Sequence, residues 1–124
     1  MIKYFTGELA EALLTTKDDT IKITHANQIA DSVLEVTIRD NVNDVHGLVE
    51  NVFIKATDES VVVTIEAIAS VGGLEGLYHT RKPATFKRSE FELTELADHI
   101  MLVIKSYHKS RLENNEMLMR ALSL

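Results

Sequence analysis

Apolar and polar residues alternate along the first half of the chain with the period of β-strands. From Val33 to Asp40 the alternation is strict, which predicts a strand with one buried and one solvated face. A shorter alternation from Thr20 to His25 predicts another strand. Two β-rich runs, Leu48 to Thr57 and Val61 to Ala69, flank Asp58-Glu59-Ser60, which suits the short loop of a hairpin. Together these segments predict an antiparallel sheet of about four strands.

The two ends of the chain carry helical periodicity instead. From Leu93 to Tyr107 apolar residues recur at intervals of three and four, as on the buried face of a helix. Asn114-Asn115 interrupts this pattern before it resumes from Met117 to Leu122, which predicts a long helix followed by a short one. Thr6 to Leu14 has a weaker helical pattern, although Met1–Phe5 could equally begin an edge strand. The predicted fold class is α+β, a sheet followed by one long and one short C-terminal helix.

The two strands of the predicted hairpin are apolar on both faces. Because side chains alternate along a strand, Phe53 lies on the opposite face from Val52 and Ile54, and Val62 and Ile68 lie on the corresponding face of the next strand. One layer of helices covers only one face of a sheet, so the other needs a second chain, a ligand or a client protein. We therefore expect Phe53, Val62 and Ile68 to form a protein-binding face.

Length and composition are those of an ordinary globular domain. The 124 residues, 45% of them hydrophobic, suffice for one domain spanning 1–124 with a core of its own. The chain has no cysteine, which excludes disulfides, thiolate metal sites and cysteine nucleophiles. No apolar run approaches the roughly 20 residues of a membrane span, and Gly7, Glu8 and Glu11 interrupt the stretch that a signal peptide needs. We expect a cytoplasmic protein without membrane contact.

The net charge of −6 is unevenly distributed. Residues 1–75 carry five basic and thirteen acidic side chains, a balance of −8, whereas residues 76–124 carry eight basic and six acidic ones, a balance of +2. An acidic surface disfavours general binding to duplex DNA, because phosphate contacts need basic side chains. It also keeps a protein that exposes apolar surface in solution.

The cations concentrate in one segment, Leu77 to Arg88, which we interpret as a loop by elimination and which contains the only proline. Its basic and aromatic side chains suit single-stranded nucleic acid or an acidic partner segment. The alternative is a solvated loop whose cations neutralise the acidic part of the chain. The candidate anion-binding residues are Tyr78, Arg81, Lys82, Phe86, Lys87 and Arg88.

Motifs for catalysis or cofactor binding are weak. Glu95 and His99 are four apart on the predicted helix, but a metal site needs further ligands. Asp44 and His46 lie in a turn, where backbone hydrogen bonding explains an aspartate. The glycines from Gly72 to Gly76 lack the lysine and hydroxyl residue of a phosphate-binding loop. We expect no enzymatic activity, no metal and no cofactor.

One stretch points to a family. It reads Gln28-Ile29-Ala30-Asp31-Ser32-Val33-Leu34-Glu35-Val36-Thr37-Ile38-Arg39. This resembles the strand entry of the SecB family of export chaperones, which has Gln, Leu, Ala, Asp, any residue, Val, any residue, Glu, Val, any residue, Leu, Arg. A weaker likeness continues through Gly47, Val52-Phe53-Ile54, Ile65 and Ile68, and so covers about residues 28–69.

The resemblance implies a sheet with helices on one face, assembly into dimers or tetramers, and apolar grooves that hold unfolded chains. Leu93 to His108 and Glu116 to Leu122 fall where the family has its two helices. Two features depart from the family pattern. The Pro-Tyr-Ala-Arg-like helix start has no counterpart, and the acidic residue that docks the translocase motor would fall, without gaps, at Ala56. Delivery of clients to that motor is therefore not implied.

The leading hypothesis is a non-catalytic, homo-oligomeric chaperone or adaptor. It would bind unfolded or partner polypeptide by burying apolar segments, without nucleotide or covalent chemistry. A small interaction or regulatory protein unrelated to that family is an equal alternative. A single-stranded nucleic-acid binder that uses residues 78–88 is a third.

Overall fold

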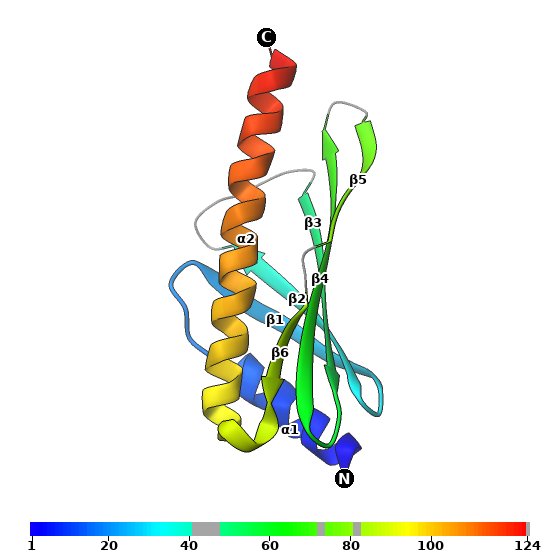
Figure 1. Ribbon diagram of the computed structural model, residues 1–124. Coiled ribbons are helices and arrows are strands. Elements are labelled where there is room, and N and C mark those ends of the chain that lie inside the picture. The colour runs from blue at the N-terminus through cyan, green and yellow to red at the C-terminus, as the bar shows by residue number, and fades with distance from the viewer. Residues whose placement is uncertain (41–47, 72–73, 81–82, 124) are drawn as a thin grey trace.

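The computed structural model has an α+β architecture in which one antiparallel sheet curls around a long helix (Figure 1). It describes residues 1–40, 48–71, 74–80 and 83–123. No helix in these ranges is both long and apolar enough to cross a membrane. In chain order the elements are α1 (Ile2–Leu14), β1 (Ile21–Ala30), β2 (Val33–Asp40), β3 (Leu48–Ala56), β4 (Ser60–Val71), β5 (Leu74–Thr80), β6 (Ala84–Lys87), the short 3₁₀ helix η1 (Arg88–Glu90) and α2 (Leu93–Ser123).

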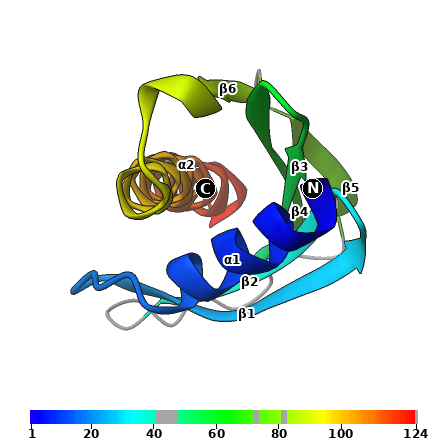
Figure 2. The same ribbon diagram turned by 90° about the horizontal axis from the view of Figure 1, so that it is seen from below.

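The six strands form a single sheet. Five of them lie side by side in the order β1-β2-β3-β4-β5, and every neighbouring pair is antiparallel. The remaining strand, β6, also pairs with β4, where Ser60 to Val63 face Lys87 to Ala84. β5 pairs with a later part of β4, from Glu66 to Val71. Seen along α2, the strands form a curved wall around that helix, and α1 lies inside the curve (Figure 2).

The hydrophobic core lies between the concave face of the sheet and the two helices. Alternate residues of the strands point into it, because successive side chains of a strand face opposite ways. From the helices, Leu9 and Leu13 of α1 and Ile100 and Ile104 of α2 are completely or almost completely buried. Burying each such side chain contributes roughly 1.5–3 kcal/mol. The strands contribute Ile21, Ile23, Leu34, Val36, Val52, Ile54, Ala56, Val61, Val63 and Ile65.

The fold class predicted from the sequence is confirmed, as are the main strands. The strand predicted from Val33 to Asp40 is β2 with the same bounds. The predicted hairpin is formed by β3 and β4. Its turn is closed by hydrogen bonds between Thr57 and Ser60, including one from the Ser60 amide to the Thr57 hydroxyl at 3.0 Å. The predicted first strand is correct but short, because β1 continues to Ala30.

The prediction of a loop from Leu77 to Arg88 is wrong. That segment contains most of β5, all of β6 and the first residue of η1. Within β6, Ala84 and Phe86 are half-buried and pack against the core, while Thr85 and Lys87 are exposed. This is the alternation of a strand, although four residues are too few to distinguish it from a loop by pattern alone.

The helix predictions need two corrections. The N-terminal segment is helical from Ile2, so the edge-strand alternative for Met1–Phe5 is wrong. The predicted break at Asn114-Asn115 is also wrong, because α2 runs without interruption for 31 residues. Asparagine in a helix costs less than about 1 kcal/mol relative to alanine, which is not enough to end a helix. The single helix replaces the two C-terminal helices that the family resemblance implied.

Candidate functional site

The candidate site is the convex face of the sheet, on the side away from both helices (Figure 2). Since Val52 and Ile54 point into the core, the residues between and beside them point outward. Phe53 lies between Glu35 of β2 and Thr64 of β4 in the register. We call this surface the outer face, and its described side chains are Val33, Glu35, Phe53, Lys55, Val62, Thr64 and Thr85.

Three apolar side chains meet at the centre of the outer face. Val62 pairs with Lys55 and Thr85, so it is the diagonal neighbour of Phe53 across β3 and β4. Val33 also pairs with Lys55 and is the diagonal neighbour of Phe53 across β2 and β3. Diagonal neighbours are about 7–8 Å apart, within reach of an aromatic ring. All three are half-buried, although no described helix packs on this side of the sheet.

Two opposite charges adjoin this apolar centre. Glu35 pairs with Phe53, and Lys55 lies between Val33 and Val62. Neither charge forms an ion pair with another described residue. The arrangement resembles that of many protein interfaces, in which a small apolar centre is bordered by polar groups. Such a surface can bury a few apolar side chains of a polypeptide, but it offers no group placed for catalysis.

Of the three residues predicted for this face, the structure describes two on it. Phe53 and Val62 are adjacent, as the alternation of side chains predicts. Ile68 belongs to β4, where it pairs with Val49 and Tyr78, but its side chain lies outside the described part of the structure. Sequence reasoning missed Val33, whose place beside Phe53 depends on the register between β2 and β3.

The segment predicted to bind anions has a different arrangement. Phe86 packs against Phe91, with ring centroids 5.9 Å apart in an edge-to-face geometry, and it belongs to the margin of the core. It therefore offers no free ring for a nucleic-acid base. Lys87 is exposed on β6. Tyr78 lies in β5 with its side chain outside the described part, and Arg81 and Lys82 lie outside the described residues.

Arg88 is used within the protein. Its Nη1 atom donates a hydrogen bond of 2.9 Å to the carbonyl oxygen of Thr57, in the turn between β3 and β4. Its guanidinium carbon also lies 3.6 Å from the ring centroid of Phe5 in α1, a cation–π contact. Arg88 thus joins α1, the hairpin turn and the segment that leads into α2. These contacts explain its position without any bound anion.

The histidines and acidic residues do not assemble into a metal centre in the described ranges, where no group of three or more potential ligands is found. His99 is exposed and lies against Phe91, with ring centroids 4.8 Å apart. Asp44, His46 and the two glycines Gly72 and Gly73 lie outside the described residues.

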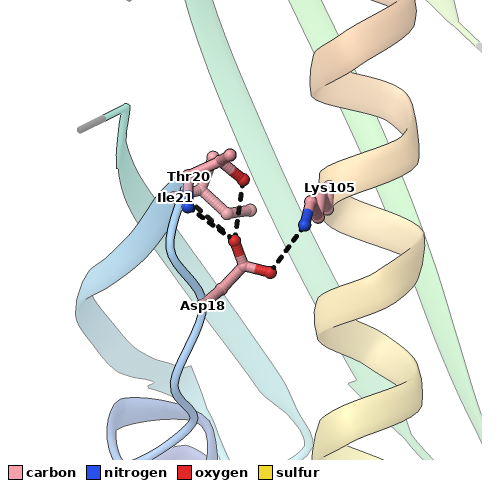
Figure 3. Close-up of polar contacts among 4 residues, drawn as sticks. All are labelled: Asp18, Thr20, Ile21 and Lys105. Atoms are coloured by element: carbon pink, nitrogen blue, oxygen red, sulfur yellow. Dashed lines mark hydrogen bonds and ion pairs between the residues drawn. The ribbon is translucent and has the colours of Figure 1, made fainter. Parts of the chain in front are cut away.

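Asp18, in the connection between α1 and β1, is held by several polar contacts (Figure 3). Its Oδ1 atom accepts hydrogen bonds from the amide and hydroxyl of Thr20, at 2.8 and 2.7 Å, and from the amide of Ile21 at 3.3 Å. Its Oδ2 atom lies 3.1 Å from Nζ of Lys105 in α2. The carboxylate therefore ties the start of β1 to the helix around which the sheet curls.

The environment of Asp18 acts on its pKa in two directions. Burial disfavours the charged form and by itself would raise the pKa. The hydrogen bonds from Thr20, Lys105 and Ile21 favour the charged form, and together they hold the pKa of Asp18 well below its usual value of 3.8. Asp18 is therefore ionised at neutral pH and acts as a structural acceptor, because a proton donor or base would need a pKa nearer the working pH.

Comparison with known proteins identifies no relative. The sequence matches no protein-family model, and no characterised protein or solved structure is significantly similar to it.

Proposed function

We propose that the protein binds unfolded or partner polypeptide chains through the outer face, as a non-catalytic chaperone or adaptor. The supporting observation is that both helices pack on the concave side, which leaves Phe53 and its two valine neighbours without a covering layer of described residues. A half-buried aromatic ring between β-branched side chains provides an apolar contact for another chain.

The physical mechanism would be the burial of apolar side chains of the client against this centre. Each Å² of apolar surface removed from water contributes about 25 cal/mol. Three half-buried side chains supply only a small area, so binding to one face should be weak and quickly reversible. A protein that binds only the unfolded client holds it away from aggregation without nucleotide or covalent chemistry.

The family resemblance is a second line of support, and it concerns the same strands. Residues 28–69 include β2, β3 and most of β4, which carry Val33, Phe53 and Val62. An antiparallel sheet with helices on one face is also what a SecB-like protein would have. Since α2 is one continuous helix and an N-terminal helix precedes the sheet, we base the proposal on the outer face and treat the resemblance as secondary.

The test is aggregation of a chemically denatured client protein, followed by light scattering with and without the chain. We expect Phe53→Asp and Val62→Asp to weaken client binding about tenfold or more, because a carboxylate replaces the apolar contact. The matched control is Ser106→Asp, which adds the same charge to an exposed position of α2, on the opposite side of the sheet from the outer face. Circular dichroism verifies that each variant is folded.

Two outcomes would contradict the proposal. One is a wild-type chain that fails to suppress aggregation at any ratio to the client. The other is a set of folded Phe53→Asp and Val62→Asp variants that protect the client as well as Ser106→Asp does.

A further inference from the structure

Two cationic side chains lie together on the convex side of the sheet, beyond the outer face. Lys22 of β1 and Arg39 of β2 are direct partners in the antiparallel register, at the end of these strands away from the turn that joins them. Both side chains are exposed. They point away from the helices, because Ile21 and Ile23 on either side of Lys22 are buried in the core. We call Lys22 and Arg39 the cation pair.

The cation pair is unfavourable within the chain by itself. Like charges directly opposite each other on neighbouring strands destabilise a sheet. Neither Lys22 nor Arg39 forms an ion pair with another described residue. Glu35, on the same side of β2, is four residues before Arg39, or about 13 Å along the strand. The cation pair thus carries two uncompensated positive charges, although residues 1–75 as a whole have a balance of −8.

The cation pair and the apolar centre of the outer face lie on one continuous path along β2. Val33 and Arg39 are six residues apart on this strand and face the same side, which places them about 20 Å apart. Phe53 pairs with Glu35 and is therefore nearer to Arg39. Thr37, between Glu35 and Arg39, is exposed. An extended polypeptide with apolar side chains on Phe53 therefore reaches the cation pair about four to six residues further along.

We propose that the outer face selects clients in which acidic side chains lie about four to six residues from an apolar stretch, and that the cation pair binds those carboxylates. This inference rests on the proposed function and adds a charge selectivity to it. A carboxylate accepts charge-assisted hydrogen bonds from the ammonium of Lys22 and the guanidinium of Arg39. It also removes the repulsion between them, so the client supplies the compensation that the chain lacks.

A polypeptide suits this surface better than a nucleic acid does. The phosphates of a nucleic acid are continuous along its backbone, and they would meet Glu35 as well as the cation pair. An acidic peptide has its charges at separate positions. Its apolar side chains also match the valines and the aromatic ring of the apolar centre.

The net charge of the chain predicts the opposite selectivity. A chain of net charge −6 attracts basic peptides at long range. At about 0.15 M salt, however, exposed charges more than roughly 8 Å apart are largely screened, so close contacts dominate. A preference for acidic clients under these conditions is therefore a specific signature of the cation pair.

Fluorescence anisotropy of labelled synthetic peptides at about 0.15 M salt tests the inference. Each peptide carries Phe-Val-Phe, then a Gly-Ser spacer of about four residues, then a pair of glutamates, glutamines or lysines. The glutamine peptide measures the apolar contact alone. We expect the wild type to bind the glutamate peptide about fivefold more tightly than the glutamine peptide, and the lysine peptide more weakly than either.

Reversing both charges should invert this order. In the double variant Lys22→Glu with Arg39→Glu, acids replace bases at the same positions, so the lysine peptide should bind most tightly. Like charges still face each other, so the melting temperature should stay close to that of wild type. The matched control is the double variant Lys3→Glu with Lys109→Glu. It changes the net charge equally at exposed positions of α1 and α2, and should keep the preference for glutamate.

The single variant Lys22→Glu provides a second readout. Opposite charges then face each other across β1 and β2, so the melting temperature should rise. The same internal pairing occupies Arg39, so the preference for the glutamate peptide should disappear. A purely structural role for Lys22 predicts instead that the variant is less stable.

The inference is overturned if the wild type binds the lysine peptide as tightly as the glutamate peptide, or if the double reversal leaves the order unchanged. It is also overturned if a single-stranded oligonucleotide binds more tightly than the glutamate peptide and displaces it, which would assign the cation pair to phosphate groups. Binding of the glutamine peptide, and its loss in Phe53→Asp, tests the apolar centre separately. Failure of the proposed function is thereby distinguished from failure of the charge selectivity alone.

Discussion

Replacing Asp18 with asparagine tests how strongly one carboxylate holds the sheet to α2. Asparagine has nearly the same shape and keeps one oxygen for the two short bonds from Thr20, but it loses the negative charge. Its amide group would face Nζ of Lys105, so a donor would replace an acceptor.

The expected loss can be estimated from the geometry. Hydrogen bonds to a charged acceptor contribute about 1.5–3 kcal/mol each, and bonds between neutral groups about half as much. Weakening the two Thr20 bonds and the Ile21 bond therefore costs about 2–4 kcal/mol. The side chain of Asp18 is 11% exposed but that of Lys105 is 42% exposed. Solvent screens the ion pair, which therefore adds less than about 1 kcal/mol. We expect Asp18→Asn to lower the free energy of unfolding by roughly 3 kcal/mol at pH 7.

The pH dependence provides the decisive assay, urea denaturation of both proteins between pH 7 and pH 2. The pKa of Asp18 is lower in the folded chain than its ordinary value of 3.8. Its contribution is therefore complete above pH 4 to 5 and is lost as the pH falls from that value toward the folded pKa, by up to about 1.4 kcal/mol per pH unit. The difference between wild type and Asp18→Asn should shrink over this window.

The matched control is Asp19→Asn, which removes the same charge from an exposed neighbour whose side chain makes no hydrogen bond or ion pair with another described residue. It should change stability by less than about 0.5 kcal/mol. The reasoning fails if Asp18→Asn is as stable as wild type at pH 7. It also fails if the difference at pH 2 equals that at pH 7.

Two further predictions concern the segment around β6. Arg88→Ala should destabilise the fold by about 1–2 kcal/mol, because it removes the hydrogen bond to the Thr57 carbonyl and the contact with Phe5. Thermal or urea denaturation measures this loss, and retention of full stability would mean that these contacts are not formed in solution. Phe86→Ala should cost about 2 kcal/mol, since a half-buried ring leaves the margin of the core. Thr85→Ala, one residue away and exposed, should have no such effect, and equal effects of the two substitutions would refute the placement of Phe86.

The local sequence pattern was sufficient to predict β2 and the β3–β4 hairpin. In β2 the alternation of side chains is itself the burial pattern, with Leu34 and Val36 in the core and Glu35 between them half-buried on the other face. The hairpin turn is also local, because Thr57 and Ser60 bond to each other across it. The same alternation put Phe53 and Val62 outside the core. These features depend on residues close in the chain, and the sequence displays them directly.

The structure around β6 and the continuity of α2 could not be predicted in this way, because they depend on more than the local pattern of residues. Phe86 and Arg88 look like a basic, aromatic loop in the sequence, but pairing of β6 with β4 brings Arg88 to Thr57 and sets Phe86 beside Phe91. The continuity of α2 could not be read from Asn114-Asn115, because two weakly unfavourable residues do not outweigh a helix of 31 residues.

The alternation and periodicity of side chains are enough to predict an antiparallel sheet with helices, and one hairpin with apolar side chains on both faces. Tertiary packing places α1 and α2 on the same concave side, sets Val33 beside Phe53 on the uncovered side, and leaves an open groove lined by Gly7 and Gln28. The physical reason is that backbone geometry fixes the period of each segment locally. Which face of a segment is covered depends on strand pairing and helix packing between residues far apart in the chain.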